Sequence, residues 1–218
     1  MTKNEAESQK TETRARRIGL MGGTFDPIHF GHLFIAEAAR AACALDEVIF
    51  FPNGTPAHAE GKVASLSGEM RLELLEIALA GNAHFRASRI ELERPGKSFA
   101  FDTIQQFQRE LGADAQLFFI VGADSMCDIL TWYRGAELFE LCHFVAASRP
   151  GFELEEAQTR LTAAQRAQTT WLHVPGLHIA SRELRARVQN DLPIRYLVPD
   201  AVVARISELN HYKERGIS

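Results

Sequence analysis

The sequence predicts an α/β fold: a doubly wound parallel sheet in one domain, with additional helices after the last strand. Two observations carry this prediction. From residue 18 onward, short apolar runs rich in β-forming residues alternate with longer segments of helical period. The 218 residues also contain no Gly/Ser linker and no internal repeat, which favours one domain over two.

Composition narrows the class of protein. With 46% hydrophobic and 24% charged residues, the chain has the composition of an ordinary globular protein. Its formal net charge of -4 argues against a nucleic-acid partner. The apolar runs are far shorter than the roughly 20 residues of a membrane-spanning helix, and the first residues lack the apolar core of a signal peptide. We therefore expect a cytoplasmic protein without a membrane partner, whose three widely spaced cysteines stay reduced.

The elements follow in order along the chain. Residues 1–17 are polar and mix both charges, which predicts a mobile tail before a domain of residues 18–218. Expected strands span residues 18–21, 47–52, 85–92, 116–121, 143–147 and 171–174. Expected helices span residues 32–43, 68–79 and 101–111, followed by an amphipathic stretch over 154–167 and two later helical segments. Ligands of such sheets bind at the carboxyl ends of the strands, so the residues just after each strand are the candidates for function.

The most informative run follows the first strand. It reads Gly22-Gly23-Thr24-Phe25-Asp26-Pro27-Ile28-His29-Phe30-Gly31-His32 and leads into a helix. The two glycines at its start allow a ligand to approach the backbone closely. His29 and His32 lie three apart on one face of the first helical turn, beside free backbone N–H groups, and Gly31 leaves room for a bulky anion. The run therefore predicts a polyphosphate site.

Other interpretations of this run stay open. The glycines could merely form a tight turn, with the histidines as surface residues at a helix start. A zinc site of His29, His32 and Asp26 is a weaker alternative, because no fourth ligand accompanies them. The glycine spacing matches neither the dinucleotide fingerprint nor the Walker loop.

The same run resembles the signature of the nucleotidyltransferase superfamily with an H-x-G-H motif, and specifically its bacterial nicotinate mononucleotide adenylyltransferases. The resemblance extends from residue 18 to about residue 206. Further segments similar to the family pattern are Pro52 to His58, Ser98-Phe99-Ala100 with Asp102-Thr103, Gly122 to Ser125, Trp132-Tyr133, Ser148 to Gly151, Ile179 to Arg185 and Pro193 to Pro199. The resemblance implies a Rossmann-like nucleotidyltransferase fold.

The resemblance also implies a reaction: adenylyl transfer from ATP to nicotinate mononucleotide, giving nicotinate adenine dinucleotide and pyrophosphate, a step of NAD biosynthesis. A phosphate monoester loses its second proton near pH ~6, so the attacking oxygen needs no general base. The protein must instead supply positioned donors and cations, and His29, His32 and Arg185 are the expected catalytic residues. We expect Mg²⁺ to be held mainly by the phosphates of ATP and not by a set of protein ligands.

By the same resemblance, two groups of residues bind the substrates. ATP is expected against Gly22, Gly23, Thr24, Phe25, His29, His32, Gly122, Asp124, Arg149, Ser181 and Arg185. The mononucleotide is expected against Asn53, His58, Ser98, Ala100, Trp132 and Tyr133. Ser181 is expected to cap a helix whose N–H groups face the phosphates, and Trp132 with Tyr133 to form a stacking platform for the pyridine ring. Plain structural interpretations remain: Asp124 as a helix cap, the arginines as solvated residues and the aromatic residues as core.

The chain departs from the family pattern at several positions. Alanine or arginine stands where the pattern has hydroxyl, proline or cationic residues, at Ala57, Ala59, Ala100, Ala180 and Arg182, and Phe99 replaces tyrosine. These departures leave open how strongly the acid mononucleotide is preferred over its amide. Two alternative functions also stay open: another adenylyl- or cytidylyltransferase, such as pantetheine-phosphate adenylyltransferase, and a catalytically weak nucleotide-sensing module. The sequence allows an oligomer but does not specify one.

Overall fold

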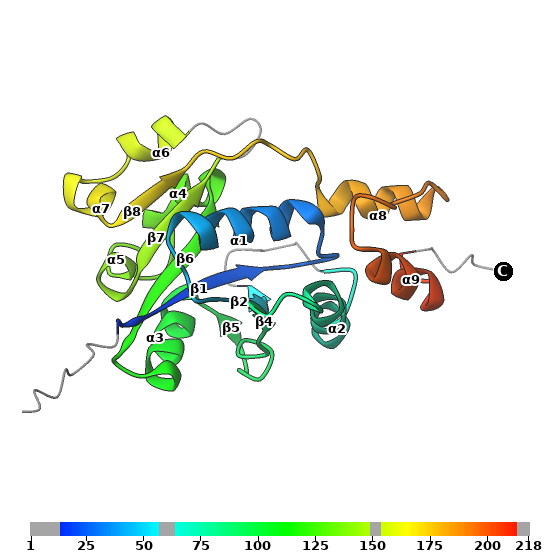
Figure 1. Ribbon diagram of the computed structural model, residues 1–218, viewed down its shortest axis with the longest axis horizontal. Helices are drawn as coiled ribbons and strands as arrows, with labels where there is room; N and C mark the ends of the chain where they lie inside the picture. Colours follow the sequence, from blue (N-terminus) through cyan, green and yellow to red (C-terminus); the bar gives the residue numbers. More distant parts are fainter. Residues whose placement is uncertain (1–13, 57–63, 149–153, 213–218) are drawn as a thin grey trace, which may run out of the picture.

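The computed structural model describes residues 14–56, 64–148 and 154–212. Its main sheet has six parallel strands in the order β4-β2-β1-β6-β7-β8 (Figure 1). These strands are β1 (Arg16–Gly23), β2 (Glu47–Pro52), β4 (Phe85–Ala87), β6 (Ala115–Gly122), β7 (His143–Ala147) and β8 (Thr169–Leu172). The chain starts at β1, moves outward to β4 and returns to β6 on the other side of β1. The strand order therefore reverses between β1 and β6, and the predicted doubly wound fold is confirmed.

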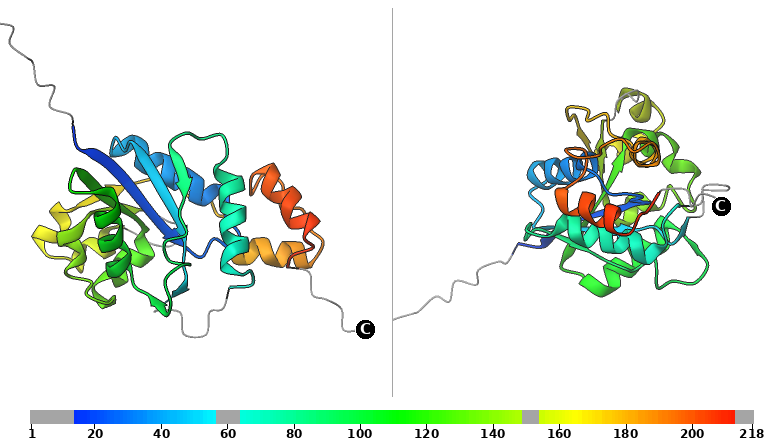
Figure 2. Two further views of the ribbon diagram at one scale, coloured as in Figure 1. Left: turned by 90° about the horizontal axis from the view of Figure 1, so that it is seen from below. Right: turned by 90° about the vertical axis from the view of Figure 1, so that its right-hand side faces the viewer.

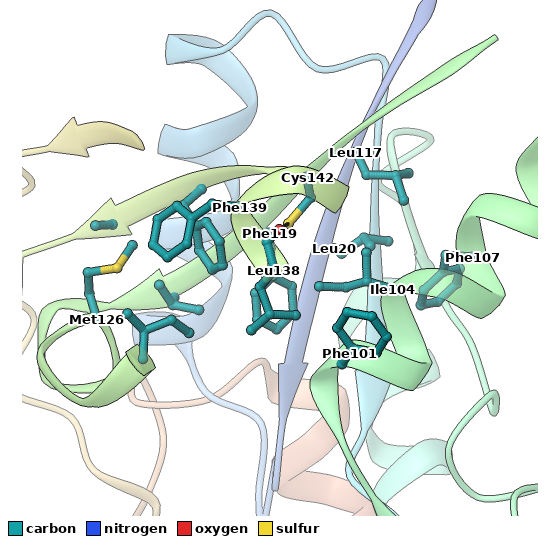
Figure 3. Packing of buried hydrophobic residues seen from close by; sticks show 14 of the residues in the cluster. Leu20, Phe101, Ile104, Phe107, Leu117, Phe119, Met126, Leu138, Phe139 and Cys142 are labelled. Atoms are coloured by element: carbon teal, nitrogen blue, oxygen red, sulfur yellow. Dashed lines mark hydrogen bonds between the residues drawn. The ribbon is translucent and has the colours of Figure 1, made fainter. Parts of the chain in front are cut away.

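Both faces of the sheet are buried. Leu117, Phe119 and Val121 of β6 belong to one hydrophobic core, whereas Phe118 and Ile120 belong to the other. Successive side chains of a strand point to opposite faces, so a continuous apolar run must be covered on both sides. Figure 3 shows the first core, in which Leu20 and Phe119 meet aromatic and aliphatic side chains of the covering helices.

The helices divide between the two faces. The first core receives residues from α3 (Ala100–Leu111), α4 (Ala123–Asp128), α5 (Leu138–Leu141) and α6 (Leu154–Thr159). The second receives residues from α1 (Phe30–Ala42), α2 (Gly68–Leu79), α8 (Ser181–Gln189) and α9 (Asp200–Glu208). Helices α8 and α9 lie beyond one end of the sheet, where α9 packs against α2 (Figures 1 and 2). A two-stranded sheet of β3 (Thr55–Pro56) and β5 (Lys97–Ser98), the helix α7 (Ala163–Ala167) and the short 3-10 helix η1 (Ile129–Thr131) complete the described elements.

Most of the predicted elements are present, with differences in their bounds. The strand expected over residues 171–174 is β8, which spans residues 169–172. The strand expected over residues 85–92 ends at Ala87, because the chain turns at Ser88, whose hydroxyl accepts from Ile90 N. Ile90 still joins the first core from this turn, so its apolar character does not indicate a strand. The stretch 154–167 forms two short helices, because Thr162 starts α7 with a capping box. The structure also has β3 and β5, which the sequence analysis does not predict.

A further difference concerns the first strand. Strand β1 begins at Arg16, two residues before the strand expected over 18–21, and residues 1–13 of the predicted tail lie outside the described part. The Arg17 side chain has partners that a tail residue lacks: its Nε donates to the Cys43 carbonyl, and its guanidinium lies 4.4 Å from the centre of the Phe118 ring. Arginine can continue a strand when its apolar stem packs and its charged end is hydrogen-bonded.

Two expectations from composition concern the cysteines and membrane-spanning helices. Cys43, Cys127 and Cys142 are free thiols, as predicted. Among the helices of the described ranges, none is long and apolar enough to cross a membrane.

Candidate active site

A cleft of about 1190 Å³ opens at the carboxyl ends of β1 and β6, the point at which the strand order reverses. Most of the predicted site residues line it. They are Gly22, Gly23, Thr24, Phe25, His29, His32, Asn53, Ser98, Ala100, Gly122, Asp124, Trp132, Ser181 and Arg185. His58 and Arg149 lie outside the described residues. Residues far apart in sequence therefore converge on one cavity, as the position of a doubly wound sheet's ligand site predicts.

The two histidines form a stacked pair at the start of α1. Their ring centres are 3.7 Å apart and the ring planes differ by 24°. The backbone N–H of His29 donates to Nδ1 of His32 at 3.3 Å, so the ring proton of a neutral His32 lies on Nε2. The buried Phe25 ring meets His32 edge to face at 5.1 Å. His32 is thus held by its neighbours in one orientation and one tautomer.

Gly31 serves this pair in a way the sequence did not indicate. A Cβ at Gly31 would lie 3.0 Å from both Cε1 and Nδ1 of the His29 ring. The buried His29 imidazole therefore occupies the space that a side chain at position 31 would fill, while Gly31 itself lines the cleft. The glycine thus allows His29 to pack tightly over the first turn of the helix.

A buried carboxylate links the loop after β1 to helix α8. Asp26 is only 2% exposed, and Oδ2 accepts from the backbone N–H of Ser65 at 2.6 Å. Arg185 Nη1 donates to the Asp26 carbonyl at 2.7 Å and lies 3.8 Å from Oδ2. Ser181, the first residue of α8, donates its hydroxyl to the Pro27 carbonyl at 2.9 Å. Ser181 is therefore not the helix cap; Ala180 holds that position, and the Ser181 hydroxyl joins α8 to the loop that carries the histidines.

The Arg71 side chain connects the segments that follow β1 and β2. Its Nη1 donates to the Thr24 carbonyl at 2.9 Å and its Nη2 to the Asn53 carbonyl at 2.8 Å. The side chain comes from α2 and is only 4% exposed. Burial lowers the pKa of the Arg71 guanidinium, and the charge of Asp26 opposes this shift. Arg71 thus places a buried positive charge behind the loop while fixing two backbone carbonyls at its edge.

The opposite side of the cleft is polar and close-packed. The Gly54 N–H donates to Glu91 Oε2 at 3.2 Å, and the Thr103 hydroxyl donates to Glu91 Oε1 at 2.8 Å. A Cβ at Gly54 would lie 2.5 Å from the Glu91 carbonyl oxygen, so this close approach requires glycine. The hydroxyl of Ser98 is buried here and has no hydrogen-bond partner among the described residues. A buried hydroxyl that lines a cleft without a protein partner is suited to a ligand.

Comparisons with known proteins agree with this geometry. Residues 20–200 match the family model described as Cytidylyltransferase-like. A protein of Moorella thermoacetica, named "Probable nicotinate-nucleotide adenylyltransferase", is 45% identical over 206 residues, covering 93% of this chain and 94% of its own length. A protein of the same name from Clavibacter michiganensis subsp. michiganensis is 45% identical over 197 residues, covering 90% and 94%. The chain belongs to the nicotinate-nucleotide adenylyltransferase family.

Solved structures show the same fold. The Plasmodium falciparum nicotinic acid mononucleotide adenylyltransferase complexed with NaAD superposes with a TM-score of 0.72 at 18% identity, covering 90% of this chain and 97% of that one. The same enzyme complexed with APC gives a TM-score of 0.71 at 19% identity. This adenylyltransferase family member therefore shares its fold with those structures.

One member of the predicted aromatic platform is misplaced. Trp132 lines the cleft and meets Phe119 edge to face at 6.5 Å. Tyr133 is not among the lining residues: it is 48% exposed, and its ring packs on Phe99 at 4.6 Å and on Phe101 at 6.3 Å. Adjacent residues that follow a helical turn point in different directions. The pair Trp132-Tyr133 therefore supplies one side chain to the cleft instead of two.

Three polar residues around the site are not predicted from the sequence: the buried Arg71 and Glu91, and the partly buried Tyr212. Arg71 lies within an otherwise ordinary amphipathic helix and Glu91 within a predicted strand, so neither stood out locally. Tyr212 donates its hydroxyl to Asp26 Oδ1 at 2.8 Å across a separation of 186 residues. A charged residue at a core position of a predicted element was the available signal for Arg71 and Glu91, because such residues are seldom buried unless they are paired.

Proposed function

We propose that this protein transfers the adenylyl group of ATP to nicotinate mononucleotide, giving nicotinate adenine dinucleotide and pyrophosphate. The observation that carries the proposal is the convergence of His29, His32 and Arg185 at the reversal point of the sheet. The 45% identity to relatives that carry the name of this activity supports the choice of substrates.

The residues around the histidine pair suit a reaction between two anions. The phosphate of the mononucleotide is already ionised at neutral pH, so the site has to align it with the α-phosphate of ATP. His32 is oriented with Nε2 as its proton-bearing nitrogen, which can donate to a phosphate oxygen as negative charge builds up. Arg185, fixed against Asp26, adds a permanent positive charge on the same side of the cleft. Pre-positioned donors of this kind lower the barrier because they need no reorganisation during the reaction.

Mg²⁺ would enter this site as part of its substrate, Mg-ATP. In residues 14–56, 64–148 and 154–212, no group of three His, Cys, Asp or Glu side chains gathers to hold a metal ion. We expect the ion to be coordinated mainly by phosphate oxygens and water, which is how Mg²⁺ commonly binds nucleotides. The ion would neutralise phosphate charge, while the histidines and Arg185 orient the oxygens that it leaves exposed.

The two ends of the cleft would bind the two nucleosides. Gly122 and Asp124 follow β6, where a carboxylate can accept hydrogen bonds from ribose hydroxyls of ATP. At the other end, the unpartnered Ser98 hydroxyl and the Trp132 ring suit the mononucleotide. Phe99 is the N-cap residue of α3 and its side chain makes no capping hydrogen bond. The backbone N–H groups of the first turn, beside Ala100, can therefore donate to the carboxylate of nicotinate.

The test is pyrophosphate release from Mg-ATP with three acceptors in parallel: nicotinate mononucleotide, nicotinamide mononucleotide and phosphopantetheine. We expect turnover with the first and much weaker turnover with the second, because donors select a carboxylate over a carboxamide. Turnover with phosphopantetheine alone would assign the protein to a different transferase activity. Nucleotide binding without turnover on any acceptor would support a sensing module instead.

A further inference from the structure

Tyr212 reaches the active site from the far end of the described chain. It lies four residues beyond α9, outside the 20–200 match to the family model. The backbone here turns through two left-handed residues, Asn210 with φ 47° and Tyr212 with φ 65°. This turn directs the tyrosine back toward the sheet, where its ring packs against the second hydrophobic core. Left-handed conformations are unfavourable for bulky residues, so the surrounding contacts must fix this one.

The Tyr212 hydroxyl ends on the buried carboxylate that holds Arg185. It donates to Asp26 Oδ1 at 2.8 Å, while Ser65 N donates to Oδ2 at 2.6 Å. Burial raises the pKa of Tyr212, and the negative charge of Asp26 raises it further, so the phenol keeps its proton and remains a donor. Both carboxylate oxygens of Asp26 thus accept hydrogen bonds from uncharged donors. Arg185 lies 3.8 Å from Oδ2 and donates its hydrogen bond to the Asp26 carbonyl instead.

In this arrangement Arg185 does not form a close ion pair with the Asp26 carboxylate. If the phenol were absent, Oδ1 would lose its donor in a site that is 2% exposed, and the carboxylate would have to turn toward a cation. Arg185 and Arg71 are the cations whose charges act on this cluster. A tighter Asp26–Arg185 ion pair would compete with a phosphate for the same guanidinium.

From these contacts we propose that Tyr212 is a positioning residue: its hydroxyl satisfies Asp26 and thereby keeps Arg185 available for the polyphosphate of ATP. The proposal rests on the proposed function, since it needs Arg185 to meet ATP. The turn after α9 is then part of the active site, although 186 residues separate Tyr212 from Asp26.

The experiment uses Tyr212→Phe in the full chain, which keeps the ring and removes the hydroxyl. Pyrophosphate release is measured while ATP and nicotinate mononucleotide are varied separately. We expect kcat/KM for ATP to fall about tenfold, the loss associated with one hydrogen bond to a charged group. KM for nicotinate mononucleotide should change less than twofold. The matched control is Tyr196→Phe, because Tyr196 has the same φ of 65° but is 81% exposed, and it should leave both parameters unchanged.

A double-mutant cycle separates positioning from a general loss of stability. In an Arg185→Ala background, Tyr212→Phe should lower kcat/KM for ATP by less than twofold, because the residue through which it acts is gone. If Tyr212→Phe proves too unstable to assay, Asp26→Asn gives the second route: it keeps an acceptor oxygen for the Tyr212 hydroxyl and removes the charge that would compete for Arg185. It should therefore lower kcat/KM for ATP by less than twofold, and a tenfold fall would contradict the proposal. Circular dichroism before each assay shows which variants are folded.

The outcomes are distinct. A tenfold further loss in the Arg185→Ala background, equal losses for both substrates, or an unchanged Tyr212→Phe enzyme would each overturn the positioning role. An unmutated chain that turns over none of the acceptors would contradict the proposed function instead, before any variant is compared.

Discussion

The two walls of the cleft that carry its cations and imidazoles are built in different ways. The histidine wall comes from one run of the chain, residues 22–32, which contains a strand end, a turn and a helix start. The second wall, the assembled wall, brings Arg71, Arg185 and Tyr212 together around Asp26 from three separate helices or turns, through contacts across 47 to 186 residues. Chemistry carried by a local motif is thus recognisable from sequence, whereas the groups that orient it depend on the whole fold.

The largest effect is expected on the histidine wall. His32→Ala should lower kcat/KM about 10²- to 10³-fold and leave the fold intact, because it removes a positioned transition-state donor from a partly exposed side chain. The measurement is the steady-state rate of pyrophosphate release, with circular dichroism to check folding. His84→Ala is the control, since His84 is exposed and directly precedes β4, at the edge of the sheet away from the cleft. Near-normal turnover of the His32 variant would remove this residue from the mechanism.

The assembled wall should respond first in stability. Arg71→Met should lower the free energy of unfolding by about 2 kcal/mol, because it deprives two partly buried carbonyls of a charged donor. It should also leave Asp26 with less positive charge nearby. Urea denaturation measures the change, and Arg89→Ala is the matched comparison: Arg89 also forms ion pairs, with Glu69 and Glu93, but its side chain is 50% exposed. That surface variant should cost no more than about 0.5 kcal/mol. Equal losses in both variants would show that burial of the Arg71 contacts does not matter.

The same contrast explains how far the sequence could be read. The strands over 47–52 and 143–147 and the helix over 68–79 are predicted residue for residue, because the apolar pattern of each segment is a local signal. Most cleft residues follow from strand ends and the family resemblance. The predicted role of Ser181 and direction of Tyr133 were wrong because each depends on a neighbour that tertiary packing supplies: the Pro27 carbonyl and the Phe99 ring.

The smallest expected effect tests a departure from the family pattern at the mononucleotide end. Ala100 is the first residue of α3 and lines the cleft beside the unpartnered Ser98 hydroxyl. Ala100→Thr restores a hydroxyl beside the Ser98 hydroxyl and the backbone N–H groups at the start of α3. One added hydrogen bond to a carboxylate should lower KM for nicotinate mononucleotide by a factor of about three to ten while kcat stays constant, because the contact forms equally in the ground and transition states. Turnover of the amide should improve less, since a neutral carboxamide is the weaker acceptor. Parallel KM measurements with both mononucleotides decide the matter: an equal gain for the two would mean that the carboxylate is bound elsewhere, and that the end of the cleft beside α3 does not select the acid.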